Sequence, residues 1–249
     1  ENINGTLVLP LYEGSESVPE SCETGMSNSL KSQINRVLSD GDFKAKKKST
    51  MTLLGGEDGK AILVGLGKAD DCTSHDFRKA GAAVTAGMKK SHGSELTVRF
   101  DNAGVANMGS FAEGMMLRDY SYDNYKQKDD DEEKTEVSVR ITCSEDEAEE
   151  LTKLVVQYKG ICKGVHLSRD LGNCPPNDMY PEVFADMARD WAKGYDNVDV
   201  TVINYDEAVK AGMGGLVAVG KGSARKPCMV IFEMNKNVKG RCPLLVGKG

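Results

Sequence analysis

The chain has 249 residues and a mass of 26.9 kDa, which exceeds one typical domain and predicts one large or two modest domains. Hydrophobic residues make up 39% of the chain and charged residues 28%, a composition typical of a globular protein and enough apolar material for a core. Lys and Arg number 32 against 38 Asp and Glu, a formal net charge of −6, which excludes a global basic footprint for nucleic acid or an anionic membrane.

Strands and helices alternate over the first 143 residues. Runs of β-branched and aliphatic residues predict strands at residues 6–9, 50–54, 60–64, 96–100 and 137–141. Helices are predicted around residues 30–38, from an N-cap at Ser74 to near Gly93, and over 111–117. This order predicts an α/β domain with a partly parallel, buried sheet. The charge run at residues 126–135 is predicted to be an exposed loop.

A long helix is predicted to begin at Ser144-Glu-Asp-Glu147, which has the pattern of a capping box. In such a box the Ser hydroxyl accepts from the amide three residues on, and the Glu carboxylate reaches back. Apolar residues then recur every three or four positions from Leu151 to Val165, so one apolar stripe runs along the helix. Gly172 and the following Pro175-Pro176 end it.

A second α/β unit is predicted after this helix. Pro181 indicates the first turn of a helix. The elements expected beyond it are strands at residues 198–203, 216–219, 229–232 and 244–246 and a short helix at 206–211. The chain starts without Met and stops soon after its last predicted strand. We therefore expect it to be part of a longer protein, because the chemistry of open α/β sheets lies beyond the strand ends.

Two glycine turns are candidates for binding phosphate. Val64-Gly-Leu-Gly67 follows a predicted strand and precedes a helix, and Gly220-Lys-Gly-Ser223 repeats the spacing. In the first turn Asp70 occupies the sixth position, where a carboxylate would oppose a pyrophosphate. The pattern favours a tight turn at both places, with a nucleotide loop as the alternative.

Other site classes have little support in the sequence. No apolar run approaches the roughly 18 residues of a membrane-spanning helix, and no signal peptide is visible. The seven cysteines never form CxxC, so reduced thiols are expected rather than a disulfide framework or a zinc cluster. His75, His92 and His166 are far apart and are expected at surfaces or helix ends. The basic stretch 221–249 favours a solvated face, with nucleic-acid binding as the weaker alternative.

One segment resembles the entry to the catalytic domain of the leucyl aminopeptidase (cytosol aminopeptidase) family. It is residues 169–185, with Asn173-Cys-Pro-Pro-Asn177 at its centre. Further stretches are similar to landmarks of that family in the same order, namely residues 39–43, 64–68, 111–126, 212–223 and 244–249. The joint order of these motifs is more specific than any one of them.

The resemblance implies a fold and an activity. It implies an N-terminal macro-like, three-layer α/β domain over residues 1–143, a linker helix over 144–172, and the start of an α/β metallopeptidase domain over 173–249. It also implies a cytoplasmic enzyme that uses two divalent metal ions, zinc or manganese, to remove N-terminal amino acids from peptides. The full-length protein is expected to be a homo-hexamer that binds neither membrane nor nucleic acid.

Lys248 is the one site residue that the resemblance assigns, as a metal ligand through its side-chain amine. That amine must be deprotonated to bind a metal. The family's other metal ligands and its catalytic residues match positions beyond Gly249, so no catalytic residue is assigned in this chain. The chain alone is therefore expected to be inactive and to bind no metal. The alternative is a non-catalytic module for oligomerisation or for binding an ADP-ribose-like nucleotide.

Overall fold

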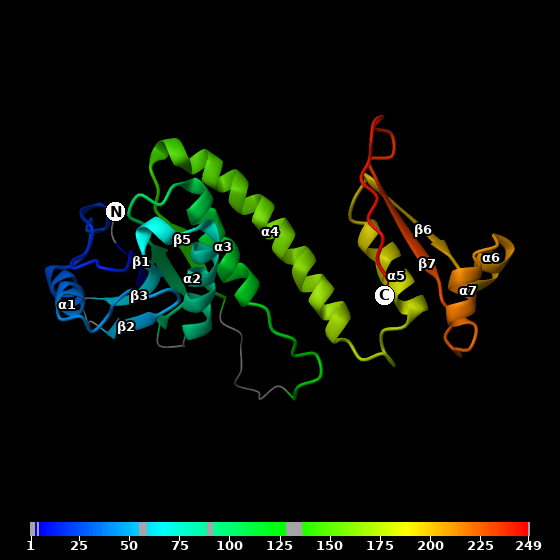
Figure 1. Cartoon of the computed structure of the whole chain (residues 1–249), viewed down its shortest axis with the longest axis horizontal. Coiled ribbons are helices and arrows are strands. Elements are labelled where there is room, and N and C mark those ends of the chain that lie inside the picture. The colour runs from blue at the N-terminus through cyan, green and yellow to red at the C-terminus, as the bar shows by residue number, and fades with distance from the viewer. Residues whose placement is uncertain (1–2, 4, 55–58, 89–91, 128–135, 249) are drawn as a thin grey trace. The chain divides into compact units, whose positions relative to one another are not determined.

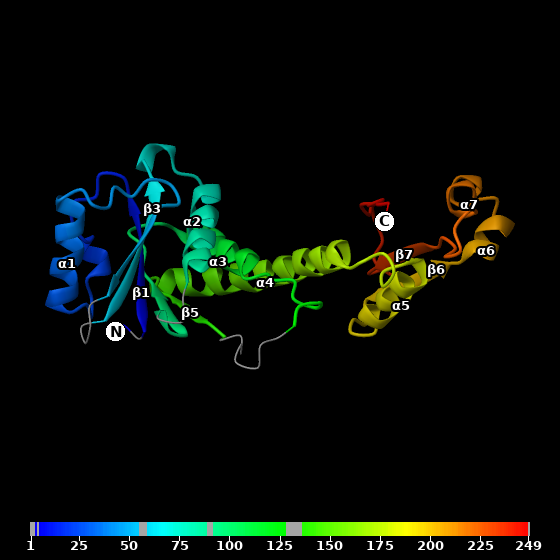
Figure 2. The ribbon, with the colours of Figure 1, turned by 90° about the horizontal axis from the view of Figure 1, so that it is seen from below.

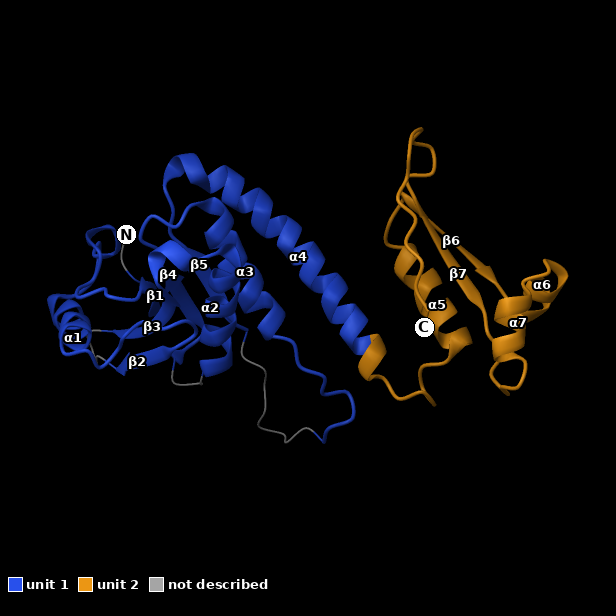
Figure 3. Ribbon diagram, in the orientation of Figure 1, with its two compact units in different colours: residues 1–170 blue, residues 171–249 orange. Residues whose placement is uncertain are grey.

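The computed structural model describes residues 3, 5–54, 59–88, 92–127 and 136–248. The chain divides into two compact units, residues 1–170 and residues 171–249 (Figure 3). Each unit has its own sheet and helices, as the alternation along the sequence predicts.

The first unit contains a five-stranded sheet in the order β2-β3-β1-β4-β5. Its strands are β1 (Thr6–Tyr12), β2 (Thr50–Leu54), β3 (Lys60–Gly67), β4 (Glu95–Val98) and β5 (Ser138–Ile141). The central strand β1 is parallel to β3 and β4, and β4 is parallel to β5, whereas β2 is antiparallel to β3. The predicted partly parallel sheet is therefore confirmed, and its predicted burial holds for β1, β3 and β4, whereas the edge strands β2 and β5 are partly exposed.

Helices cover both faces of this sheet, which gives three layers (Figure 2). Helix α1 (Asn28–Ser39) packs on one face, and α2 (Ser74–Gly87) and α3 (Val105–Arg118) pack on the other. Successive side chains of a strand point to opposite faces. Leu7 and Leu9 of β1 accordingly join the core with α1, whereas Val8 joins Phe77 and Phe111 in the core with α2 and α3. Two 3-10 turns, Glu20–Cys22 and Ala69–Asp71, lie in the connections.

Helix α4 (Glu145–Asn173) packs along α3, which lies between α2 and α4 (Figure 1). Leu151 and Cys162 are buried, and the Cys162 thiol lies 3.9 Å from the backbone oxygen of Glu113. At its start the Glu147 carboxylate accepts from the backbone N and the hydroxyl of Ser144, at 3.2 and 2.8 Å. The predicted capping box is thus half correct, because the Ser144 hydroxyl donates to Glu147 instead of accepting from an amide.

The second unit has α5 (Pro181–Ala192), α6 (Tyr205–Lys210) and α7 (Gly214–Gly220), and an antiparallel pair of strands, β6 (Val198–Ile203) and β7 (Met229–Met234). Helix α5 covers this pair. The Trp191 ring packs edge-on against Phe232 of β7, with 5.9 Å between ring centroids. Pro181 begins α5 as predicted, because proline is tolerated in the first helical turn.

Four local predictions are wrong. Residues 216–219 lie in helix α7 instead of a strand, because a short apolar run fits either structure until its neighbours decide. Residues 244–246 form no strand, and their side chains are exposed. The N-cap of α2 is Thr73, whose side chain bonds to Asp76, instead of Ser74. Helix α2 ends at Gly87, before Gly93.

Other expectations have simpler outcomes. All seven cysteines are free. Among the described residues, no helix is both long enough and apolar enough to cross a membrane. The charge run at 126–135 starts with the exposed Lys126 and Gln127, and its residues 128–135 lie outside the described residues.

Candidate functional site

The glycine turn at the end of β3 is the first candidate, and its polar groups are bound by the chain itself. The backbone N of Gly65 donates to the oxygen of Ser49 at 2.8 Å, and that of Gly67 donates to Ala45 at 2.9 Å. The oxygen of Gly65 accepts from Lys48 at 2.9 Å. The amides that a phosphate-cradling loop would offer are therefore used to hold residues 45–49 on the strand.

Both glycines are needed for this close approach. A Cβ atom at Gly65 would overlap the backbone of Ala45 and Lys46. Gly67 has a φ of +80°, which glycine adopts at little cost, and a Cβ atom there would come within 2.5 Å of the Lys47 side chain. The geometry supports the tight-turn interpretation of Val64-Gly-Leu-Gly67, and no nucleotide loop is formed.

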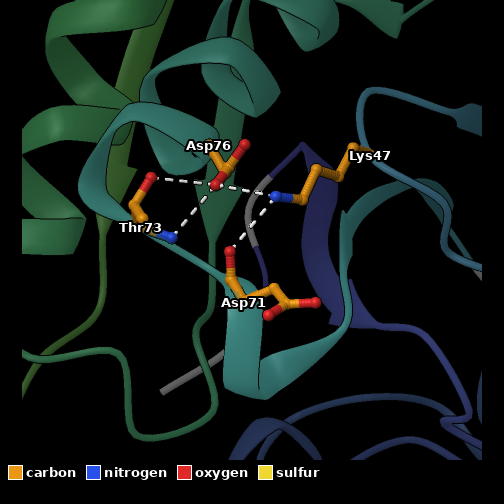
Figure 4. Close-up of polar contacts among 4 residues, drawn as sticks. All are labelled: Lys47, Asp71, Thr73 and Asp76. Atoms are coloured by element: carbon orange, nitrogen blue, oxygen red, sulfur yellow. Dashed lines mark hydrogen bonds and ion pairs between the residues drawn. The ribbon is translucent and has the colours of Figure 1, made fainter.

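A polar cluster ties the same segment to the start of α2 (Figure 4). The Lys47 ammonium lies 3.0 Å from Oδ2 of Asp76 and donates to the backbone oxygen of Asp71 at 3.2 Å. Asp76 also accepts from the backbone N and the hydroxyl of Thr73, at 3.0 and 2.9 Å. The cluster closes the N-terminal turn of α2, and it engages both the Lys47 ammonium and the Asp76 carboxylate.

The protonation of Asp76 reflects these contacts. Burial by itself raises the pKa of the Asp76 carboxyl, whereas the hydrogen bonds from Lys47 and Thr73 lower it more strongly. The resulting pKa is about 2, below the ordinary value of 3.8. Asp76 is therefore ionised at neutral pH and serves as a helix cap and ion-pair partner.

The second glycine turn, Gly220-Lys-Gly-Ser223, follows helix α7 instead of a strand. A Cβ atom at Gly220 would overlap the ring of Pro227. The Lys226 ammonium donates to the oxygen of Lys221 at 2.9 Å, and the Arg225 guanidinium stacks over Tyr180 at 3.9 Å. The two basic residues that follow this turn, Arg225 and Lys226, therefore make contacts within the chain.

The three histidines do not form a site together. His75 is exposed on α2, as expected. His92 is buried, against expectation. Its Nε2 pairs with the Thr52 hydroxyl at 3.3 Å, and its backbone oxygen accepts from the Thr6 hydroxyl. His166 is partly buried on α4, 5.3 Å from the Tyr120 ring. Within the part of the chain that the structure describes, no three His, Cys, Asp or Glu side chains gather to hold a metal ion.

Lys248 lies in the exposed stretch of residues 241–248, which belongs to no helix or strand. A metal site needs several ligands at bonding distance of one point. The described residues place no such cluster around this amine, so by themselves they do not fit a two-metal centre.

The structure does bring together basic residues that the sequence analysis did not group. Arg78, Lys79, Arg118 and Arg169 line one open hollow of about 350 Å³. They come from α2, α3 and α4. Apart from the adjacent Arg78-Lys79 pair, no local pattern signals them, because their proximity depends on helix packing.

Comparison with known protein families finds two domain matches, which follow one another along the chain in the same order as the two units. Residues 8–129 match the N-terminal domain of the cytosol aminopeptidase family, and residues 166–249 match the catalytic domain of the same family. The chain belongs to the cytosol aminopeptidase family. The resemblance inferred from the motifs is therefore confirmed, including its two-domain order.

Curated relatives agree with this family. A protein of Rhizobium etli named "Probable cytosol aminopeptidase" is 36% identical over 218 residues, which cover 83% of this chain and 43% of the relative. A protein of the same name from Stutzerimonas stutzeri is 31% identical over 98% of this chain and 51% of its own length. The chain thus spans about half the length of the curated relatives it matches.

Solved structures share the fold. A mutant of tomato leucine aminopeptidase superposes with a TM-score of 0.76 at 22% identity, over 95% of this chain and 49% of that one. The bottromycin maturation enzyme BotP in complex with Mn superposes with a TM-score of 0.70 at 23% identity, over 92% and 44%. The mixed α/β architecture expected for the family is confirmed.

Proposed function

We propose that this protein is a metal-dependent aminopeptidase that removes N-terminal amino acids from peptides. The observation that carries the proposal is the match of both family domains in order along one chain. The catalytic-domain match begins within α4 and runs to the end of the chain.

The proposal includes the division of the chain by role. Residues 1–143 are the macro-like N-terminal domain, 144–172 the linker helix, and 173–249 the first part of the catalytic domain. The three-layer arrangement of the first unit supports the first assignment. The position of α4 supports the second, although its residues up to Asp170 belong to the first compact unit.

Lys248 is proposed as the residue of this chain that binds a metal. Divalent zinc or manganese would polarise the peptide carbonyl and activate water when bound. The structure of BotP with Mn supports a metal in a protein of this fold. Because the described residues form no metal cluster around Lys248, this chain alone is expected to show no peptidase activity.

The remaining proposals concern location and assembly. A cytoplasmic protein is proposed because the curated relatives carry the name cytosol aminopeptidase. A homo-hexamer is proposed for the form that has the full length of those relatives. The nucleotide-binding alternative is not proposed, because the amides of Gly65 and Gly67 donate to the chain's own carbonyls.

Hydrolysis of leucine p-nitroanilide with added zinc or manganese tests the proposal. The 249-residue chain is compared with a form extended to the length of its relatives, and with Lys248→Met and Lys221→Met in that extended form. Activity is expected only in the extended form, and Lys248→Met is expected to remove it while Lys221→Met retains it. Absence of activity in every form would overturn the proposal. Full activity of Lys248→Met would overturn the role of Lys248.

A further inference from the structure

A basic hollow lies on the first unit, outside the segment that carries Lys248. Its volume is about 350 Å³, within the range of pockets that take small ligands. The residues that line it are Arg78, Lys79, Ala82, Gly114, Leu117, Arg118, Tyr120 and Arg169. We define these residues as the basic hollow. Helices α2, α3 and α4, which form it, lie next to one another (Figure 1).

The basic hollow carries more positive than negative charge. The Nε of Arg78 pairs with the Glu113 carboxylate at 2.7 Å. In the described parts of the chain, no carboxylate forms an ion pair with Lys79, Arg118 or Arg169. Three cations are therefore gathered without a carboxylate partner, in a chain whose net charge is −6.

Helix ends explain part of this arrangement. Arg118 lies in the last turn of α3, where a cation is favoured by the helix dipole. Arg169 donates to the backbone oxygen of Leu117 at 3.1 Å, which satisfies a carbonyl at the same helix end. Neither contact involves Lys79. The positive charges that line the basic hollow would attract an anion.

The groups present match a phosphoryl group well. Guanidinium groups donate to phosphate oxygens in a planar fork, and an ammonium adds a point charge. Among the described residues, Arg169 donates one hydrogen bond to the protein, and its Cζ atom lies 5.4 Å from the centroid of the Tyr120 ring. Its other N–H groups are therefore available to a ligand. Tyr120 is held by its hydroxyl, which donates to Asp170 at 2.9 Å. Leu117 and the Tyr120 ring offer an apolar wall for an organic group.

We propose that the basic hollow binds the phosphoryl dianion of a small molecule, through Lys79, Arg118 and Arg169. The dianion comes either from a phosphate monoester, whose organic part contacts Leu117 and Tyr120, or from free phosphate. This site is independent of the proposed peptidase activity, because none of its residues lies in the segment that carries Lys248. Binding there also stabilises the packing of α2, α3 and α4.

Calorimetric titration of the 249-residue chain tests the proposal, with phenyl phosphate and inorganic phosphate as probes. The variants are Lys79→Ala and Arg118→Ala, because neither side chain makes a protein ion pair among the described residues. The matched control is Arg36→Ala, which removes the same charge from an exposed position of α1, on the opposite face of the sheet. Circular dichroism and thermal unfolding verify that each variant is folded.

Saturable binding of phenyl phosphate is expected. Lys79→Ala or Arg118→Ala is expected to raise the Kd at least about tenfold, a loss of about 1.4 kcal/mol in binding free energy. Arg36→Ala is expected to leave the Kd unchanged. Tighter binding of phenyl phosphate than of inorganic phosphate assigns the basic hollow to an ester, and equal binding assigns it to free phosphate. Absence of saturable binding for both probes, or an equal loss in Arg36→Ala, would overturn the proposal. Because the readout is binding, its failure leaves the peptidase proposal untouched.

Discussion

The Glu113 carboxylate of α3 lies 2.7 Å from Nε of Arg78 on α2, and it is nearly buried while the Arg78 side chain is 35% exposed. The pair joins two helices that approach closely, because a Cβ atom at Gly114 would overlap the backbone oxygen of Arg78. It also sets the charge at one wall of the basic hollow. Glu113 therefore has two roles. It joins α3 to α2, and its negative charge offsets the positive charge of Arg78 beside the basic hollow.

Replacing Glu113 by Gln tests both roles. The buried partner of Arg78 loses its charge, so the free energy of unfolding is expected to fall by roughly 1–3 kcal/mol. The basic hollow gains net positive charge, so its affinity for phenyl phosphate is expected to rise. Urea unfolding and titration measure the two effects. Weaker phosphate binding by a folded Glu113→Gln variant would contradict the electrostatic role.

Asp76 is expected to make stability depend on pH. Its pKa is about 2 in the folded chain and 3.8 ordinarily, so its contribution is present above pH 3.8 and is lost as the pH falls toward 2. Allowing for solvent screening at the partly exposed Lys47, Asp76→Asn should lower the free energy of unfolding by about 1 kcal/mol at pH 7. The difference from wild type should shrink as the pH falls below 4.

The matched control is Asp71→Asn. Lys47 binds the backbone oxygen of Asp71, not its carboxylate, so this variant removes a neighbouring charge without breaking the contact. Urea unfolding at several pH values between 3 and 7 compares the two variants. Equal losses of stability for Asp71→Asn and Asp76→Asn at pH 7 would show that general charge, not the ion pair, is responsible.

Two glycine substitutions should act in opposite directions. Gly65→Ala forces a methyl group against the backbone of Ala45 and Lys46, and such overpacking costs about 1–3 kcal/mol. Gly160→Ala in α4 meets no atom within 4 Å and should stabilise the helix by about 0.5–1 kcal/mol. Thermal unfolding of both variants measures the signs. A neutral Gly65→Ala would mean that residues 45–49 do not hold their close contact with β3.

Thiol labelling should separate the cysteines by burial. Burial raises the pKa of Cys22, which is 1% exposed, and of Cys162, which is 3% exposed. Cys143 and Cys242 are exposed, although desolvation and the Glu147 carboxylate also raise the pKa of the Cys143 thiol. A thiolate must form and be reached by the reagent, so the exposed pair should react first and the buried pair only on unfolding. Mass spectrometry of partially labelled chain identifies the sites. Rapid labelling of Cys22 in folded protein would contradict this packing.

The sequence by itself determined the order of most elements and the family. Periodic apolar residues, turn residues and Pro181 are local signals, so strands such as β1 and β3 and helices such as α1 and α5 could be predicted. The motif around Asn173-Cys-Pro-Pro-Asn177 identified the family for the same reason, because its residues are contiguous.

Tertiary structure decided what depends on contacts between distant residues. The apolar run at 216–219 is compatible with a strand or a helix, and its surroundings in the folded chain make it a helix. By sequence alone, the amides of Gly65 and Gly67 could donate to a phosphate or to another segment. In the folded chain they donate to the backbone oxygens of Ser49 and Ala45. Arg118 and Arg169 are 51 positions apart in the sequence, and the packing of α3 against α4 brings them to one hollow. Burial and proximity are properties of the folded chain, which no local pattern specifies.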